Sequence, residues 1–244
     1  MTKGVDFNLV SGHYEKNSLV QQGAAETLFS LLNIGENESV LDVGCGPGNL
    51  TKQIRKKTNG RIVGIDDSAE MIKSAKKNYS KYNIAFCKMK AEEMNFHDEF
   101  DVIFCNSTFQ WFTEPSRAVK AFHSTLKKGG RVGIQAPGGG RYCENFLKGV
   151  ERVRKDERTC EVFSNWENPF FMPENTRDYN AVFENVGFKV ISSEIKTMKT
   201  RYTPEEAFDI FSSGAIAGYL NQEYYRSIII EESQKNILNV LRSL

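Results

Sequence analysis

Residues 40–50 decide the fold and read Val40-Leu41-Asp42-Val43-Gly44-Cys45-Gly46-Pro47-Gly48-Asn49-Leu50. A short apolar run passes directly into a turn with three glycines, and a helical pattern begins at about Asn49. Glycines at a strand-to-helix turn let the backbone adopt positive φ angles and come close to a ligand. The stretch therefore predicts a ligand-binding turn between a buried strand and a helix.

The alternation of strand and helix continues on both sides of this turn. Helical patterns occupy 15–33, 49–57, 68–79 and 116–126, and apolar runs of strand length occupy 39–43, 61–65, 84–88, 101–105 and 131–135. Such alternation predicts βαβ units with right-handed crossovers. We expect a doubly wound, mostly parallel, Rossmann-like α/β sheet with its ligand at the carboxyl ends of the strands.

The regular pattern ends near Pro137. Helix-like segments follow at 142–157, 173–186, 204–213 and 222–243, and a strand is expected at 188–195, with a continuation towards Tyr202. We expect a single domain over 1–244 with a cofactor-binding core at 36–137. Helical cap elements at the N-terminus, at 138–186 and at 204–244 would cover the site.

The composition excludes several classes of function. Lys plus Arg (32) nearly balances Asp plus Glu (31), which gives no global attraction to nucleic acid or to an anionic membrane. There is no apolar run of about 18 residues and no secretion signal at the N-terminus. The five cysteines are odd in number and widely spaced, which favours reduced thiols without a metal site. We therefore expect a cytoplasmic enzyme, monomeric or homodimeric.

The spacing of the glycines indicates the chemistry of the ligand. A dinucleotide enzyme would show G-x-G-x-x-G, which seats a pyrophosphate on the helix N-terminus. Here the turn reads G-x-G-x-G, and Asp42 precedes its first glycine by two residues. A carboxylate there would repel phosphates and accept hydrogen bonds from an ammonium group, which favours S-adenosylmethionine over NAD. Cys45 is interpreted as a small residue in a tight turn rather than a nucleophile.

Asp66 ends the second strand, 18 residues beyond Gly48. An acid at the tip of that strand is placed to accept both hydroxyls of a ribose. The alternative is that Asp66 only caps the following helix. Asp67 is adjacent, but Ile65 is the last apolar residue of the strand, so we assign the ribose to Asp66.

These residues resemble the class I S-adenosylmethionine-dependent methyltransferases over roughly 8–137. VLDVGCGPGNLT resembles the first motif of that family, GIDDSAEMI the second and FDVIFCNSTFQWF the fourth. NSTFQWF and the opening FNLVSGHYEKNSLVQQ resemble two branches, the trans-aconitate and the malonyl-carrier-protein methyltransferases, which make methyl esters from carboxylates. The resemblance implies O-methylation of a small or carrier-bound acid. The alternatives are transfer to carbon or nitrogen, and cofactor binding without turnover.

The resemblance also implies roles for individual residues. The methionine end of the cofactor would lie against Asp42, Gly44, Cys45, Gly46, Gly48 and Asn106, and its ribose against Asp66. The adenine would lie between Asp67, Met71, Ala91 and Glu92, with Glu92 standing in for an aspartate that many relatives carry there. Phe109 would line the acceptor site, where Gln110, Trp111 and Tyr14 would position the acceptor.

A carboxylate acceptor is already ionised at neutral pH, because its pKa is about 4, so its methylation requires no general base. Catalysis would then rest on positioning and on the exclusion of water. Arg141 is the best-placed cation for the substrate acid, and Arg201 is a weaker candidate. Trp166, Phe170 and Phe171 would either line an acceptor pocket or pack in a core.

The family closes its sheet with a further antiparallel strand, and the helical pattern at 221–244 supplies none. We expect either that the chain is shortened or that 196–202 takes that place.

Overall fold

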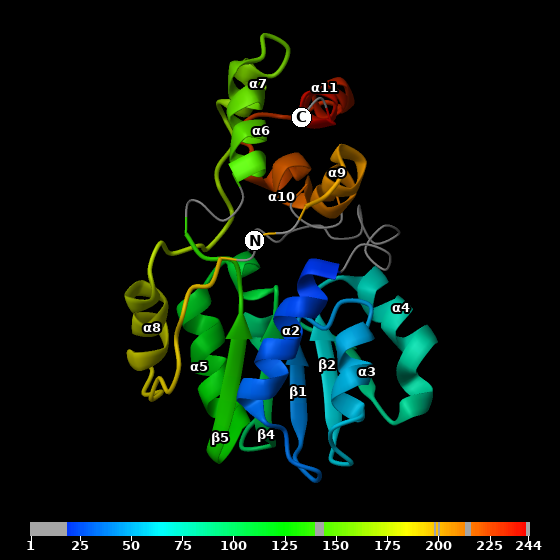
Figure 1. Cartoon of the computed structure of the whole chain (residues 1–244), viewed down its shortest axis with the longest axis vertical. Coiled ribbons are helices and arrows are strands. Elements are labelled where there is room, and N and C mark those ends of the chain that lie inside the picture. Colours follow the sequence, from blue (N-terminus) through cyan, green and yellow to red (C-terminus); the bar gives the residue numbers. More distant parts are fainter. Residues whose placement is uncertain (1–18, 140–143, 198, 200, 213–215, 243–244) are drawn as a thin grey trace.

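The computed structural model describes residues 19–139, 144–197, 199, 201–212 and 216–242. Its centre is a sheet of five parallel strands in the order β3-β2-β1-β4-β5 (Figure 1). The strands are β1 (Val40–Val43), β2 (Ile62–Asp66), β3 (Ala85–Lys88), β4 (Phe100–Asn106) and β5 (Leu126–Gln135). The prediction of a doubly wound parallel sheet is confirmed. The strand order reverses between β1 and β4, which places the ligand site at the carboxyl ends of these two strands.

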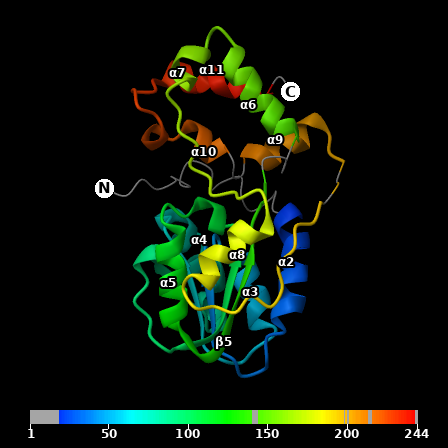
Figure 2. The same cartoon turned by 90° about the vertical axis from the view of Figure 1, so that its left-hand side faces the viewer.

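Helices cover both faces of the sheet, because apolar side chains of each strand alternate between them. Val102 and Phe104 pack with α2 (Leu19–Leu32), α3 (Asn49–Arg55) and α4 (Ala69–Tyr79). Ile103 and Cys105 pack on the other face with α5 (Pro115–Thr125) and α8 (Thr176–Glu184). Figure 2 shows α2 and α5 on opposite sides of the sheet. Short 3-10 turns follow α4, β3 and β4. They are η2 (Ser80–Tyr82), η3 (Ala91–Glu93) and η4 (Phe109–Trp111).

A second group of helices, here called the cap lobe, stands beyond the carboxyl ends of the strands (Figures 1 and 2). It has an apolar cluster of its own, which includes Val153, Phe163, Tyr219 and Ile237. Trp166 stacks on Phe163 with ring centroids 5.1 Å apart. The lobe comprises α6 (Glu144–Lys155), α7 (Cys160–Phe163), α9 (Pro204–Ser212), α10 (Ile216–Leu220), η5 (Gln222–Tyr224) and α11 (Glu231–Arg242).

Three expectations for the second half of the chain were wrong. The strand expected at 188–195 does not form, and the described part of 196–202 contains no strand, so β5 is an edge of the sheet. Helix α8 was expected in a cap, but Tyr179 and Phe183 pack it against the sheet core. The helix expected at 222–243 begins only at Glu231. The start of the first expected helix, 15–18, lies outside the described residues.

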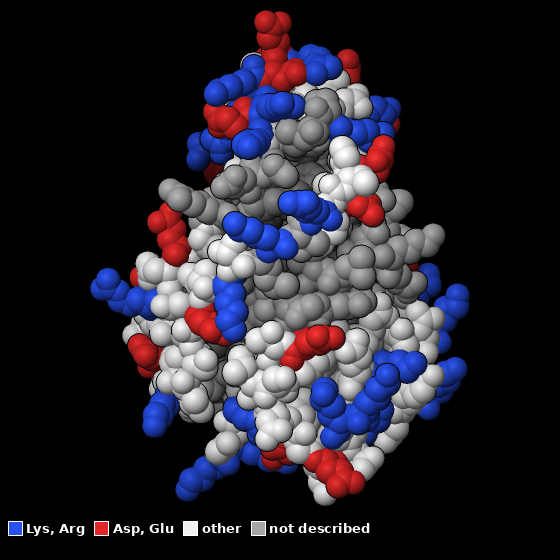
Figure 3. Space-filling view, in the orientation of Figure 1, with Lys and Arg blue, Asp and Glu red and all other residues white. Residues whose placement is uncertain are grey.

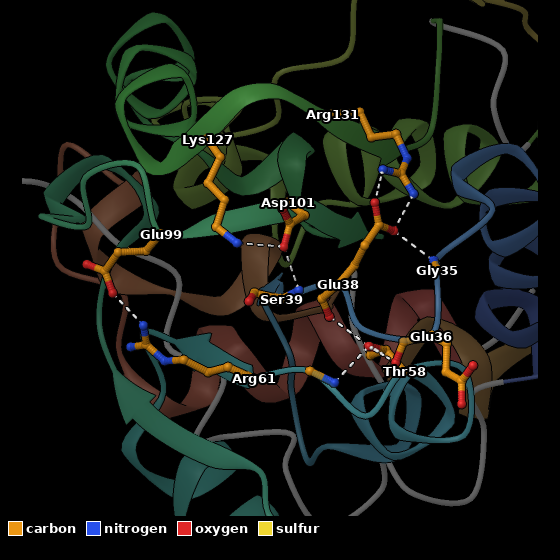
Figure 4. A network of polar contacts seen from close by, with 11 residues as sticks. Gly35, Glu36, Glu38, Ser39, Thr58, Arg61, Glu99, Asp101, Lys127 and Arg131 are labelled. Carbon is orange, nitrogen blue, oxygen red and sulfur yellow. Dashed lines mark hydrogen bonds and ion pairs between the residues drawn. The ribbon is translucent and has the colours of Figure 1, made fainter.

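Polar contacts join the elements at the end of the sheet remote from the cap lobe (Figure 4). The Arg131 guanidinium donates two hydrogen bonds of 2.7 Å to the Glu38 carboxylate and a third, from Nε, to the carbonyl of Leu32. Asp101 Oδ2 accepts from the backbone N–H of Ser39 and from Lys127 Nζ, each at 2.8 Å. These bonds tie α2, β1, β4 and β5 together and leave the carboxyl ends of the strands available for a ligand.

Lys and Arg are interspersed with Asp and Glu on the face of the molecule shown in Figure 3. No helix among the described residues combines the length and the apolarity needed to cross a membrane.

Candidate functional site

The glycine turn after β1 is fastened to its neighbours by backbone bonds. The N–H groups of Gly44 and Cys45 donate to the carbonyl of Ile65, at 2.8 and 2.9 Å. Gly44 has a φ of 72°, and a Cβ atom there would overlap the hydroxyl group of Thr108. Only glycine therefore lets this turn pass between the ends of β2 and β4.

Asp66 holds the turn from the end of β2. Its Oδ2 accepts the N–H of Gly46 and its Oδ1 the N–H of Ser68, both at 2.9 Å. The cap of α4 is Ser68, whose hydroxyl accepts the N–H of Met71 at 3.2 Å, so the alternative of Asp66 as the helix cap is wrong. Each carboxylate oxygen keeps a lone pair for a further donor. The arrangement suits a ligand with two neighbouring hydroxyls.

Burial raises the pKa of Asp66 from its ordinary 3.8 to about 6. Desolvation is the largest cause, the N–H groups of Ser68 and Gly46 oppose it, and the charge of Asp67 adds to it. A carboxylate in this state gains more from two ligand hydroxyls than an exposed one would, because their hydrogen bonds replace lost hydration.

Asp42 lies beneath the turn instead of on the surface of the site. It is 2% exposed, and its Oδ2 accepts a 2.6 Å hydrogen bond from the hydroxyl of Thr51 in α3. Burial raises its pKa to about 7, while Thr51 lowers it. Through this hydrogen bond Asp42 fixes α3 to β1. Because its carboxylate is buried beneath the turn, this geometry disfavours direct contact with the ammonium group of a ligand.

Cys45 and Gly48 are likewise parts of the framework. Burial raises the pKa of the Cys45 thiol well above its ordinary value, which disfavours a nucleophilic thiolate. Gly48 is the N-cap residue of α3 and has a φ of 88°, and a Cβ there would lie 2.8 Å from the ring of Tyr79.

A cavity of about 2080 Å³ opens at the carboxyl ends of the strands and continues along β5. It brings together nine of the predicted site residues, which are Gly44, Gly46, Asp66, Asp67, Met71, Ala91, Glu92, Gln110 and Trp111. The Nζ atom of Lys90 lies 3.8 Å from Oδ2 of Asp67. Glu92 Oε1 accepts the N–H of Thr113 at 3.1 Å, which fixes the chain that leads into α5. These residues come from the carboxyl ends of four strands, β1, β2, β3 and β4, and the segments that follow them, and they line one cavity.

The prediction that Phe109 lines the acceptor site is wrong, because its side chain does not reach the cavity. Its side chain is 0% exposed and packs against Phe112, Phe171 and Phe183, with ring centroids 5.1, 5.8 and 5.5 Å apart. Its neighbours Gln110 and Trp111 do line the cavity, since the 3-10 turn directs successive side chains to different sides. Asn106 is 7% exposed at the end of β4, beside the hydroxyl of Ser107. Tyr14 and Arg141 lie outside the described residues.

Two wall residues were missed by the sequence analysis. Ser107 has a φ of 56°, and its hydroxyl donates to Gln135 Oε1 at 2.9 Å. The hydroxyl of Thr108 donates to the carbonyl of Gly44 at 3.3 Å. The signal that could have found them is the polar run Asn106-Ser107-Thr108 directly after a buried strand. Among the described residues, no group of three or more His, Cys, Asp or Glu is placed to hold a metal ion.

Comparison with known proteins gives a family for this geometry. The family model described as "Methyltransferase domain" matches residues 34–187. A malonyl-[acyl-carrier protein] O-methyltransferase of Calditerrivibrio nitroreducens is 35% identical over 156 residues, which are 63% of this chain and 59% of the relative. A trans-aconitate 2-methyltransferase of Rhodopseudomonas palustris is 29% identical over 114 residues, 46% of this chain and 44% of the relative. The chain therefore spans about three fifths of the first relative's length and less than half of the second's.

A solved structure shows the same fold. The phosphoethanolamine N-methyltransferase 2 of Haemonchus contortus, in complex with phosphomonomethylethanolamine and S-adenosylhomocysteine, superposes with a TM-score of 0.60 at 18% identity. The superposition covers 96% of this chain and 52% of that one.

Proposed function

Because the chain belongs to the S-adenosylmethionine-dependent methyltransferase family, we propose that it transfers a methyl group from that cofactor to a carboxylate of a small or carrier-bound acid. The assignment of the cofactor rests on Asp66. This residue lines the cavity and accepts a hydrogen bond from the glycine turn, which lies where the strand order reverses. The observation that carries the acceptor is the similarity to relatives named for malonyl-carrier-protein and trans-aconitate methylation.

The residues present fit S-adenosylmethionine. Asp66 offers lone pairs for the two ribose hydroxyls, and Gly44 and Gly46 let the methionine end come close to the backbone. Asp67, Met71, Ala91 and Glu92 form the wall next to Asp66, where the adenine would lie. When bound, the cofactor supplies an electrophilic methyl group on a sulfonium.

The protein's part in the reaction is to orient the acceptor and exclude water. Gln110 and Trp111 would hold the acceptor so that one carboxylate oxygen could bond to the methyl carbon, while the electron pair of the broken carbon–sulfur bond would stay with sulfur. The products are a methyl ester and S-adenosylhomocysteine, and no proton is transferred. Because the acceptor is already ionised, Gln110, Trp111 and the cap lobe above them have only to hold it in line with the carbon–sulfur bond.

The proposal is tested by calorimetric titration with S-adenosylmethionine and, separately, with NAD. We expect micromolar binding of the first alone. Incubation with free and carrier-bound carboxylic acids should then give S-adenosylhomocysteine and a methyl product that mild base cleaves. A base-stable product would indicate transfer to carbon or nitrogen, and binding without any product would indicate a cofactor-binding protein.

A matched pair of variants separates the site from general effects on folding. Asp66→Ala should weaken cofactor binding by roughly 1–3 kcal/mol, since it removes the acceptor for the ribose hydroxyls. Glu70→Gln changes an exposed acid one turn further along and should bind as the wild type does. Equal affinities for a folded Asp66→Ala and the wild type would contradict the assignment.

A further inference from the structure

Gln110 lies where the sheet meets the cap lobe. It is in η4, which follows β4, and the residue is 8% exposed and lines the cavity. Its backbone carbonyl accepts the N–H of Phe171 at 2.8 Å, from the segment that leads out of the cap lobe. The residue is therefore held from two sides before any ligand enters.

The orientation of the Gln110 amide is fixed by one hydrogen bond. Nε2 donates to the carbonyl of Ser107 at 2.9 Å, and the reversed amide would place two oxygens in contact. Oε1 is therefore turned away from Ser107. It is buried from water and accepts no hydrogen bond from the part of the chain that the structure describes.

A buried acceptor without a donor is unfavourable, and native proteins contain few of them. Such an atom beside a large cavity is explained when a ligand supplies the missing donor. The donor is not the reacting carboxylate, because an ionised carboxylate has only acceptors and would be repelled by Oε1. A neutral donor suits this atom, because a buried cation beside an uncharged amide would lack a counter-charge.

We propose that Gln110 is a specificity-determining residue whose Oε1 accepts an amide N–H from the arm of a thioester-linked acid. The inference rests on the proposed function and narrows it, because free polycarboxylates carry no such donor when ionised, whereas the arm of a carrier-bound acid does. The Phe171 bond to the Gln110 carbonyl holds the cap-lobe segment against this subsite.

The test compares two malonyl thioesters that differ in one group. One is made with N-acetylcysteamine, and the other with its 2-acetoxyethanethiol analogue, in which oxygen replaces the amide N–H. The wild type should show a kcat/KM about tenfold higher for the amide, mostly through KM, because the ester leaves Oε1 without its donor. Gln110→Met, of similar size, should reduce this preference to about one and leave affinity for S-adenosylmethionine within about twofold.

The matched control is Gln135→Met. Gln135 lines the same cavity, but its Oε1 already accepts from the hydroxyl of Ser107, so this variant should keep the preference for the amide. A folded Gln110→Met that keeps the preference, or that loses cofactor affinity in the same proportion as kcat/KM, overturns the subsite. A wild type that methylates both thioesters equally also overturns it and leaves the proposed function standing. A wild type that methylates a free acid and neither thioester overturns the subsite and leaves the proposed function standing, whereas one that binds S-adenosylmethionine and methylates no acid overturns both.

Discussion

At the scale of single residues, the raised pKa of Asp66 makes cofactor binding depend on pH. The carboxyl is half-protonated at about pH 6, and ribose hydroxyls donate to its ionised form. Binding therefore lowers this pKa, and affinity for S-adenosylmethionine should rise with pH up to about 6 and then level off. Below pH 6 we expect a loss of up to about tenfold per pH unit, measured by calorimetry between pH 5 and pH 8.

The control for this profile is Asp66→Asn, which keeps the shape and removes the titration. It should bind weakly at every pH, with the slope near pH 6 abolished, while Glu70→Gln keeps the wild-type profile. A slope that persists in Asp66→Asn would assign the titration to another group.

The Thr51–Asp42 pair makes stability depend on pH. The pKa of Asp42 in the folded protein, about 7, exceeds its ordinary 3.8, so ionisation between those values lowers the free energy of unfolding as pH rises. Thr51→Val removes the 2.6 Å donor from the buried carboxylate. We expect a loss of about 1–3 kcal/mol at pH 8 and a smaller one at pH 5, measured by urea unfolding.

The control is Thr27→Val, at an exposed threonine of α2, which should change the free energy of unfolding little at either pH. Equal losses at pH 5 and pH 8 for Thr51→Val would be evidence against this account.

Individual residues also show what sequence reasoning could reach. The positions of Asp66 and Gly44 at the cavity were predictable, because the carboxyl ends of neighbouring parallel strands meet at one edge of the sheet. Phe109 was placed in the site with its neighbours, since sequence adjacency does not reveal that a 3-10 turn separates one side chain from the next. The unpaired oxygen of Gln110 depends on a bond to Ser107 that no pattern encodes.

At the scale of elements, β1 to β4 were predicted to within one residue at each end, because the strands of a parallel sheet are nearly continuous apolar runs. The last strand, β5, begins at Leu126, well before its expected start at Arg131. The strand at 188–195 was predicted from the same kind of pattern and does not form. A strand requires a hydrogen-bonded partner, and an apolar pattern alone cannot show whether a partner is available. Helix α8 was misplaced for a related reason, since its apolar face fits a cap or a sheet equally well.

The junction of α2, β1 and β5 depends on Arg131, which no sequence motif indicated. Its two bonds to Glu38 and its bond to Leu32 are partly buried. Arg131→Met should therefore lower the free energy of unfolding by about 1–3 kcal/mol, because Glu38 and a helix-end carbonyl lose their donors. Arg131 holds the pKa of Glu38 below its ordinary value, so the contribution is present at neutral pH and is lost as pH falls below about 4.

Arg61→Met provides the comparison for this junction. Arg61 and Glu99 form an ion pair at the same end of the sheet, with side chains 51% and 36% exposed, and such pairs contribute little. Denaturant unfolding of both variants at pH 7 should separate them clearly. Equal stabilities would show that the Arg131 contacts are as weak as a surface pair.

At the scale of the whole molecule, the sheet and the cap lobe have separate apolar cores, and the sequence predicted the first much better than the second. Trp166 was left between a pocket and a core, and the structure packs it against the apolar core of the cap lobe, in which Tyr219 is buried. The two bodies meet where Trp111 of η4 packs on Phe170, with ring centroids 4.8 Å apart. Gly218 of α10 lies next to both rings of this contact. Its carbonyl accepts the indole N–H of Trp166 at 2.9 Å.

Gly218→Ala tests whether this contact positions the acceptor. Alanine favours a helix over glycine by about 1 kcal/mol, but its Cβ would lie 2.7 Å from Phe170 and 3.3 Å from Trp111. Such overpacking costs about 1–3 kcal/mol and should displace the cap lobe from η4. We expect the KM for the acceptor to rise about tenfold, a change in tryptophan fluorescence, and affinity for S-adenosylmethionine within about twofold. Phe170→Leu removes the aromatic ring from the same contact without overpacking and should raise the KM in the same direction. If Gly218→Ala and Phe170→Leu both kept the wild-type KM, the cap lobe would not be held over the acceptor through this contact.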